Sequence, residues 1–498
     1  MTAQAPAQGT APTKVPARSA GLKLLLVCGL ALLMSIPALF VFSVLQGRTQ
    51  RADEVAREIG GRVGGPQTFL GPVIAVPYLK PAPPQPPVAP GQVAPPAPQP
   101  ERGVYVIFPQ RGSAVVDTRI EARSRSLFNV PVYQSDVAFG SAFDLRQVAP
   151  PAGTVLYWDY AELLIGASDP RGALSDITAT VGGRPLSLAP ASTVSEIQLN
   201  APTDTHRANP VGENRALRFS GAPVGGVVRP GAVFEVAARL RFSGAQRVAV
   251  LPFAKTTAVT LNGDSTRSSV TIDPSFDGGF MPATRRVESG RFSAGWSIPF
   301  VARGVPGQGD YVDIGRLGPG AVGVTLVEPA NPYQAVERSL KYALMFVGLV
   351  FLTFFVFETT TSRRVHPAQY ILIGLAQIIF YLLLLAIAEQ LGFDIGFLIA
   401  AVATVGLISA YAWTVFDSRR QGVRALVVFS LLYAGIYVLM RLEEMALLVG
   451  SVAAFLAIAA VMWFTRRIDW YGMTDTGSKP PPLRPPAPPP AEPATSPG

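Results

Sequence analysis

Reactive side chains are scarce in this chain of 498 residues, which holds two histidines and one cysteine. Cys28 lies in an apolar run and has no disulfide partner, so cysteine-rich zinc and iron–sulfur sites are excluded. His206, in a polar segment, is the only histidine available to a Ser–His pair there, which argues against a hydrolase. His366 precedes Pro367 and is interpreted as a helix cap, with a pH sensor as the alternative. We therefore predict no catalytic residue, no metal site and no cofactor.

Two glycine-containing segments resemble binding loops. GGRVGG at 60–65 lacks the Gly-Lys-Ser/Thr ending that grips nucleotide phosphates, and it precedes a strand, so it predicts a flexible joint. In PSFDGGFMP (274–282), Asp277 stands before two glycines. This pattern predicts a tight turn closed by Pro282, with a ligand-gripping loop as the alternative.

Polar residues within apolar runs are the other place where chemistry is expected, because ionisable groups inside a membrane are usually functional. Glu358, Glu389 and Asp394 are predicted to lie at the ends of spans, where interfacial water solvates them. Gln377 is the most polar residue at the middle of a span. We interpret it as a hydrogen-bonding link between helices, with substrate contact as the alternative.

Six apolar runs are long enough to cross a bilayer. The mean hydropathy of +0.32 and the 49% apolar content exceed those of ordinary soluble proteins. The first run, 22–46, is longer than a signal-peptide core and lacks an Ala-x-Ala site, so we predict an uncleaved anchor helix. Five further runs follow, at about 340–358, 368–389, 394–416, 424–440 and 445–465. They predict a five-helix transmembrane bundle over 339–466.

Residues 47–338 have a different character. Short alternating runs rich in β-branched and aromatic residues, separated by Gly, Pro, Asn and Asp, predict a large antiparallel β-rich domain. Residues 81–100 hold ten prolines, and ten more follow Ser478 in the tail at 467–498. We interpret both as polyproline linker or tail rather than as ligands of SH3-type domains. Residues 1–21 predict a disordered tail.

Positive charge on the short connections predicts the orientation of the chain. Arginines follow the second, fourth and sixth runs (Arg363, Arg364, Arg419, Arg420, Arg424, Arg466 and Arg467), whereas 390–393 and 441–444 carry only Arg441 with Glu443 and Glu444. The positive-inside rule then places both termini in the cytoplasm and the β domain in the periplasm. Residues 47–338 contain 28 Lys+Arg and 24 Asp+Glu, interspersed, so no nucleic-acid partner is predicted. The predicted partners are the lipid bilayer and an unknown envelope component or protein.

Blocks across residues 22–471 resemble the CreD family of bacterial inner-membrane proteins, described as cell-envelope integrity proteins. The blocks are GGPQTFLGPVIAVPY (64–78), FNVPVY (128–133), PSFDGGFMP (274–282), KYALMFVGLVFLTFFVFE (341–358), HPAQY (366–370) and MWFTRRIDWY (462–471). The resemblance implies one plus five spans and a large periplasmic domain, linked to envelope stress and altered tolerance of colicins and β-lactams. It supplies no molecular activity. The insert at 81–100 departs from the usual pattern, which puts the strand register there in doubt.

Two functional hypotheses follow. In the first, the chain is a non-enzymatic inner-membrane protein that supports envelope integrity and the stress response. Its periplasmic β domain binds or senses an envelope component, and its helix bundle anchors the domain or relays a signal. In the alternative, the chain is a membrane transporter or lipid-handling protein that works through the C-terminal bundle.

Overall fold

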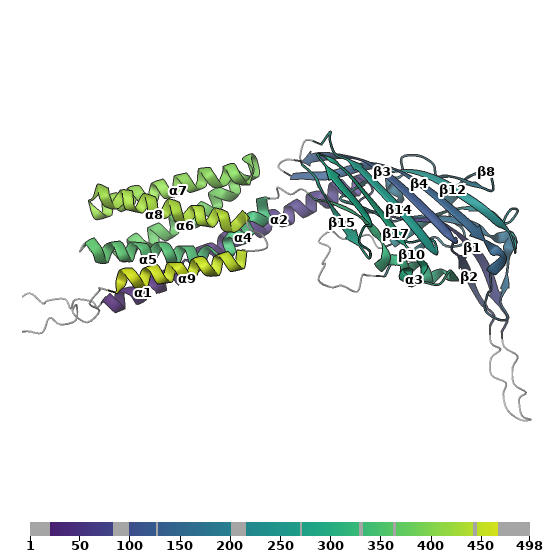
Figure 1. Cartoon of the computed structure of the whole chain (residues 1–498), viewed down its shortest axis with the longest axis horizontal. Coiled ribbons are helices and arrows are strands. Elements are labelled where there is room, and N and C mark those ends of the chain that lie inside the picture. The colour runs from purple at the N-terminus through teal and green to yellow at the C-terminus, as the bar shows by residue number, and fades with distance from the viewer. Residues whose placement is uncertain are drawn as a thin grey trace, which may run out of the picture. The chain divides into compact units, whose positions relative to one another are not determined.

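The computed structural model describes residues 20–82, 99–125, 128–200, 216–268, 271–327, 332–361, 365–441 and 446–466. It divides the chain into two compact units, residues 1–45 with 332–498 and residues 46–331. The first unit is helical and the second is built from two β-sheets (Figure 1). Residues 1–19 of the predicted N-terminal tail, the predicted C-terminal tail, most of the Pro-rich segment 81–100 and His206 lie outside the described residues.

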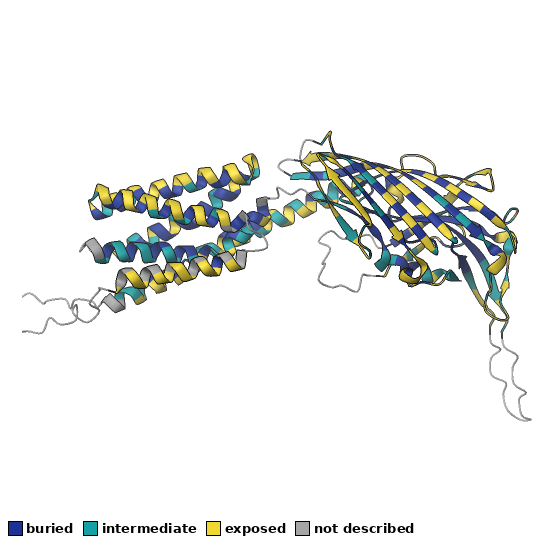
Figure 2. Cartoon of the chain, viewed as in Figure 1, coloured by how far each residue is buried: buried dark blue, intermediate teal, exposed yellow. Residues whose placement is uncertain are grey.

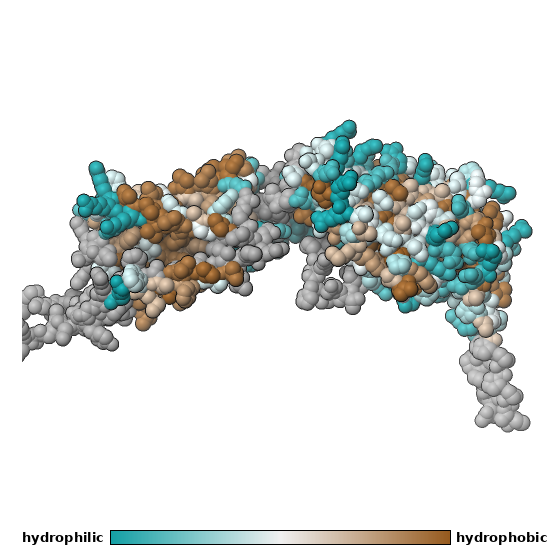
Figure 3. Space-filling view, viewed as in Figure 1, coloured by the Kyte–Doolittle hydropathy of each residue, from teal (hydrophilic) through white to brown (hydrophobic). Residues whose placement is uncertain are grey.

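The helical unit has helices at every predicted apolar run. They are α1 (Ala20–Leu33), the start of α2 (Ser35–Val63), α4 (Pro332–Lys341), α5 (Ala343–Thr361), α6 (Pro367–Leu391), α7 (Phe393–Phe416), α8 (Arg419–Arg441) and α9 (Ala446–Thr465). Apolar residues cover much of the visible surface of these helices (Figure 3). A soluble protein rarely exposes so large an apolar surface, so these helices face lipid.

By length and hydropathy, four helices of the described residues are suited to cross a membrane. They are Lys23–Val63, Pro367–Leu391, Phe393–Phe416 and Arg419–Val438. The segments Tyr333–Lys341 and Ala343–Thr359 are bent by 52° and give a fifth span if the pair counts as one. Helix α9 adds 20 residues, most of them apolar. The described helices therefore support a multi-pass protein, and the count of six spans stays a prediction.

The β unit consists of two sheets. The first, sheet A, has the order β10 (Glu196–Gln198), β11 (Ala216–Pro223), β6 (Glu162–Ala167), β1 (Gln67–Lys80), β13 (Arg247–Val250), β19 (Val322–Val327) and β15 (Asp273–Gly278), with β2 (Glu101–Ile107), β5 (Val155–Leu156), β9 (Ala189–Pro190) and β18 (Gln308–Asp310) joined alongside. The second, sheet B, has the order β16 (Thr284–Glu288), β17 (Arg291–Ile298), β14 (Thr256–Asp264), β3 (Arg111–Arg125), β4 (Phe128–Asp144), β12 (Val233–Ala245), β7 (Thr178–Val181) and β8 (Arg184–Ser187). Short helical segments lie between strands: η1 (Leu145–Gln147), η2 (Trp158–Tyr160), η3 (Pro170–Gly172), α3 (Phe300–Arg303) and η4 (Tyr311–Gly320).

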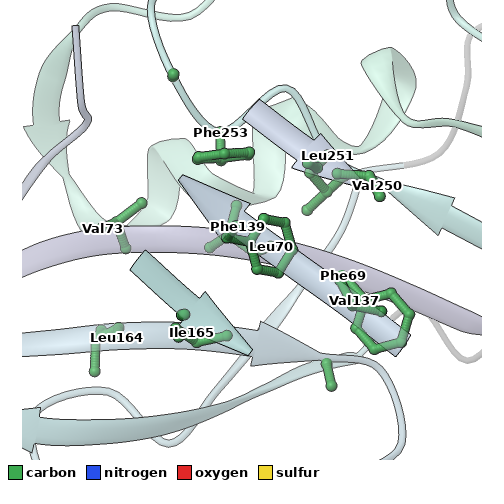
Figure 4. Close-up of a cluster of buried hydrophobic side chains, with 14 of the residues drawn as sticks. Phe69, Leu70, Val73, Val137, Phe139, Leu164, Ile165, Val250, Leu251 and Phe253 are labelled. Atoms are coloured by element: carbon green, nitrogen blue, oxygen red, sulfur yellow. The ribbon is translucent and has the colours of Figure 1, made fainter. Parts of the chain in front are cut away.

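The two sheets share one apolar core. Strands β3 and β12 of sheet B alternate buried and exposed residues, which is visible as dark and light bands in Figure 2. Inward side chains of β1, β4, β6 and β13 meet in the cluster drawn in Figure 4. The rings of Phe69 and Phe242 join the sheets edge to face, with centroids 5.3 Å apart. Such a pair adds about 0.5–1.5 kcal/mol beyond its area burial.

The sheets are mixed, which corrects the prediction of an antiparallel domain. Strand β1 runs parallel to β13, and β3 runs parallel to β14. The other named pairings among the described strands are antiparallel. Parallel neighbours need a long crossover connection. The alternation within one strand carries no information about such a distant partner.

The Pro-rich segment leaves the register of its flanking strands intact. Strands β1 and β2 pair without interruption from Ile74↔Ile107 to Lys80↔Glu101. Lys80 and Glu101 also form an ion pair at 3.5 Å. The doubt about register near 81–100 is therefore removed, because pairing continues to the last residue on each side.

The glycines at 60–65 form a packed helix end, which corrects the predicted flexible joint. Helix α2 continues to Val63, and Gly64 has a φ of +97°. A Cβ atom at Gly64 would lie 2.6 Å from the Cα of Gly172 and 2.8 Å from Nε2 of Gln67. That Nε2 donates to the carbonyl oxygens of Gly64 and Asp169 at 2.8 and 2.9 Å. Close backbone contact therefore requires glycine here.

Candidate functional site

His366 is the N-cap of α6, as predicted. Its Nδ1 accepts a hydrogen bond from the amide of Ala368 at 3.2 Å. The amide of His366 donates to Oε1 of Gln369 at 2.9 Å, which completes a capping box ahead of Pro367. The imidazole is thus engaged in holding the start of the helix, and nothing in this geometry favours the pH-sensor alternative.

Glu358 is buried, which corrects the prediction that interfacial water solvates it. The residue is 7% exposed. Lys23 of α1 donates to Oε1, the amide of Val365 donates to Oε1 at 2.8 Å, and the hydroxyl of Tyr370 donates to Oε2 at 3.1 Å. Lys23 Nζ also donates to the carbonyl of Val365 at 3.2 Å. Three protein donors therefore take the place of water around this carboxylate.

This carboxylate cluster joins three helices. Lys23 lies on α1, Glu358 on α5 and Tyr370 on α6. Phe351 and Phe354 pack against the Tyr370 ring, with centroid distances of 5.5 and 6.5 Å. A buried ion pair stripped of one partner leaves an uncompensated charge. The arrangement therefore links the first apolar helix to the C-terminal bundle through buried polar contacts.

Glu389 and Asp394 also have partners within the helical unit. The hydroxyl of Tyr333 on α4 donates to Oε1 of Glu389 on α6 at 3.1 Å. The hydroxyl of Tyr437 on α8 donates to Oδ1 of Asp394 on α7 at 3.1 Å. Both carboxylates are less buried than Glu358. Each of these contacts links two helices.

Gln377 links α6 to α8, in agreement with the prediction of an interhelical contact. It is 3% exposed, and its amide lies beside the hydroxyl of Tyr433. Its Oε1 atom has no hydrogen-bond partner among the described residues. The link is therefore made on one side of the amide only.

Asp277 lies on strand β15, which corrects the predicted tight turn. The strand pairs antiparallel with β19, and Gly323 stands opposite Asp277. The carboxylate accepts from Nε of Arg247 at 3.2 Å and from the hydroxyl of Thr325. Asp277 therefore takes part in a polar contact across three strands, and the ligand-gripping alternative has no support.

Two buried charged residues of the β unit escaped the sequence analysis. Glu162 accepts hydrogen bonds from the amides and hydroxyls of Ser192 and Thr193, at 2.6–3.2 Å. The guanidinium of Arg303 lies 4.1 Å from the centroid of the Phe108 ring and donates to three backbone carbonyls. Burial lowers the pKa of Arg303 to about 10, so it stays charged at neutral pH. Both residues hold loops in place.

A groove of about 590 Å³ crosses the outer face of sheet B near one end of the sheet. Its lining is Arg111, Gly112, Ser113, Gly140, Ser141, Ala142, Thr180, Gly182, Gly183, Glu235, Val236 and Ala237. Ala142 pairs with Arg111 on one side and with Glu235 on the other, so the backbone positions of Arg111 and Glu235 lie about 10 Å apart, at two strand spacings. Neither charged side chain has an ion-pair or hydrogen-bond partner within the described part of the chain.

Candidate metal sites are missing from the described residues. No group of three or more His, Cys, Asp or Glu side chains is placed there to hold a metal ion. The polar side chains of the helical unit stand in separate interhelical contacts. The sites best suited to function are thus the carboxylate cluster around Glu358 and the groove between Arg111 and Glu235.

Long apolar helices joined to a large two-sheet β unit define a multi-pass membrane protein. The chain belongs to the CreD family of inner membrane proteins, because the family model, described as "Inner membrane protein CreD", matches residues 19–471. The inner membrane protein CreD of Escherichia coli (strain K12) is 27% identical over 449 residues, which cover 90% of this chain and 92% of that protein. The resemblance noted from the sequence blocks is thereby confirmed.

One solved structure, an M1 zinc metallopeptidase from Deinococcus radiodurans, aligns with 10% identity. The alignment covers 44% of this chain and 42% of that enzyme, with a TM-score of 0.18. So low a score supports no argument about the fold or the activity of this chain.

Proposed function

We propose that this inner-membrane protein supports cell-envelope integrity without catalysis, and that its β unit faces the periplasm and binds an envelope component. The groove between Arg111 and Glu235 carries the proposal, because it is open and its two opposite charges are unpartnered in the described chain. The carboxylates of the helical unit, in contrast, are engaged by Lys23, Tyr333 and Tyr437. The bundle then serves as anchor or relay.

The groove suits a ligand that carries both an amine and a carboxylate, such as a short peptide of the envelope. Arg111 recognises an anion through its guanidinium and Glu235 recognises a cation. The sheet surface between Arg111 and Glu235 is formed by the small residues Gly140, Ala142 and Ala237, so an extended ligand can lie against the strands. Specificity would come from the spacing of the ligand's two charges.

The test is complementation of a strain that lacks the endogenous protein. Arg111→Ala with Glu235→Ala should lose tolerance of a β-lactam at unchanged protein level. The matched control is Glu121→Ala with Arg123→Ala, which removes one charge of each sign from exposed positions of β3 outside the groove. Full tolerance in the groove variant, or equal loss in the control, would reject the groove as the binding site.

The alternative function is transport or lipid handling through the bundle, and the unpartnered Oε1 of Gln377 is the observation that favours it. An anchor tolerates Gln377→Leu, because a hydrogen bond between membrane helices averages only about 0.6 kcal/mol. We expect Gln377→Leu and Glu389→Gln to retain function and deletion of the β unit to lose it. Loss of function in Gln377→Leu at normal abundance would favour the transporter.

Orientation is tested by reporter fusions. Fusions after Gly65 and Gly392 should report the periplasm, and fusions after Ser362 and Ser418 should report the cytoplasm, because the arginines lie on alternate connections. A cytoplasmic signal from the β unit would overturn the proposed orientation and, with it, the envelope ligand.

A further inference from the structure

The helical unit contains an apolar crevice of about 260 Å³ between α1, α5 and α9. Leu24, Cys28 and Ala31 of α1 line one wall, Gly348 and Leu352 of α5 line the other, and Ile458 of α9 closes the third side. The lining side chains are apolar apart from the Cys28 thiol. An apolar crevice of this kind does not favour the binding of a polar substrate.

The crevice has the length and position of a lipid tail. It follows α1 from Leu24 to Ala31 and α5 from Met345 to Leu352, which is about 10 Å along each helix at 1.5 Å per residue. One leaflet of the hydrocarbon core is about 15 Å deep. The Lys23–Glu358 pair marks the outer end of the crevice, since Lys23 directly precedes Leu24. The crevice therefore extends from the membrane interface into one leaflet.

Gly348 leaves space that its own helix does not fill. A Cβ atom built on Gly348 would meet no atom within 4 Å. Ile458, on the third side, is 58% exposed in the isolated chain. In a membrane such apolar space is filled by hydrocarbon, because no side chain of the described residues occupies it.

Cationic side chains stand at the interfacial end. The Lys23 side chain is 27% exposed. Arg466, one residue past the end of α9, lies over the ring of Trp463 at 3.5 Å from its centroid. Exposed Trp and Arg side chains of this kind are typical of the headgroup level. Lys23 keeps part of its side chain exposed although it is paired with Glu358, and Arg466 is exposed, so both are available to contact a lipid phosphate at this level.

We propose that this crevice binds one acyl chain of a phospholipid, whose phosphate lies at the end marked by Lys23 and Arg466. The bound lipid would be a resident part of the packing between the first helix and the bundle. This site lies in the helical unit and is independent of the groove on sheet B.

The experiment uses the full-length protein in nanodiscs of phosphatidylethanolamine and phosphatidylglycerol, with a small fraction of phosphatidylglycerol that carries a diazirine on one acyl chain. After photolysis, mass spectrometry should find crosslinks concentrated on residues 24–31 and 345–352. Gly348→Leu fills the crevice and should lower this yield at least fivefold, with Gly348→Ala intermediate. Native mass spectrometry should show one retained lipid in the unmodified protein and none in Gly348→Leu.

The matched control is Gly29→Leu. Gly29 lies on α1 beside Cys28, outside the crevice lining, and a Cβ there also meets no atom within 4 Å. Its crosslink yield should match that of the unmodified protein. Crosslinks spread evenly over all lipid-facing helices, unaffected by Gly348→Leu, would overturn the proposal and leave only unspecific boundary lipid. The Ala variant preserves the test if the Leu variant does not fold.

Discussion

Removal of Lys23 alone should destabilise the helical unit more than removal of both charges of the Lys23–Glu358 pair. Lys23→Met leaves Glu358, which is 7% exposed, with the Val365 amide and the Tyr370 hydroxyl as donors. Breaking a buried pair typically costs about 3–5 kcal/mol, and the two remaining donors place the expected cost near the lower figure, at about 3 kcal/mol. Glu358→Gln should cost about 2 kcal/mol, because the orphaned Lys23 is partly exposed to water.

The double variant should cost about 2 kcal/mol, because no buried charge is then left without a partner. The two substitutions are therefore expected to be coupled by about 3 kcal/mol. The assay is unfolding of the full-length protein in mixed micelles of dodecyl maltoside and increasing sodium dodecyl sulfate, followed by tryptophan fluorescence. The control cycle uses Tyr333→Phe and Glu389→Gln, for which a coupling of about 0.6 kcal/mol is expected. A Lys23–Glu358 coupling below about 0.5 kcal/mol would refute a buried tie between these helices.

Three further predictions concern the β unit within the full-length protein. Gly64→Ala should lower the free energy of unfolding by about 2–4 kcal/mol, because of backbone strain and contact with Gly172. Gly65→Ala should lower it by about 1–2 kcal/mol, because its φ is +61° but no described atom lies within 4 Å of the added Cβ. Equal losses in denaturant titrations would contradict the packed helix end. Hydrogen bonds from Arg146 lower the pKa of Asp144 from 3.8 to about 2, so this carboxylate adds stability above about pH 4 that is lost as the pH falls through about 2. Asp144→Asn should therefore be less stable than the unmodified protein at pH 5, and the difference should shrink towards pH 2; a difference independent of pH would exclude the ionised side chain as the cause. Glu162→Gln should lower the free energy of unfolding by about 2–3 kcal/mol, because the NH2 group of the glutamine cannot accept the hydrogen bonds that Ser192 and Thr193 donate to Glu162. A change below about 0.5 kcal/mol in chemical unfolding would show that the loop does not depend on this carboxylate.

Local patterns in the sequence predicted most of the elements. Each apolar run became a helix, and the strands fall where β-branched residues alternate. The His366–Pro367 pair predicted a helix start because a cap depends only on residues within one turn. Features that depend only on residues a few positions apart can therefore be predicted from the sequence.

The errors concern partners distant in the sequence. The local sequence predicts Glu358 in interfacial water, because its main partner, Lys23, lies 335 residues away. The one available signal was the position of Lys23, a single cation inside the first apolar run. Asp277 had the sequence of a turn, but pairing with β19 and the contact to Arg247 outweigh that local preference. The glycines at 60–65 have the sequence of a flexible joint, but the contact with Gly172 requires glycine at position 64.

The hairpin of β1 and β2 has a practical consequence for the chain between its strands. The chain leaves the sheet after Lys80 and returns at Glu101, directly opposite. The pairing of β1 with β2 thus holds the two ends together for any length of the connection. The entropic cost of closing the connection rises by only about 0.6 kcal/mol for each doubling of its length. This position can consequently accept insertions, deletions or a whole inserted module while the sheet keeps its pairing. It offers a natural place for an affinity tag or a fluorescent protein in a functional full-length chain.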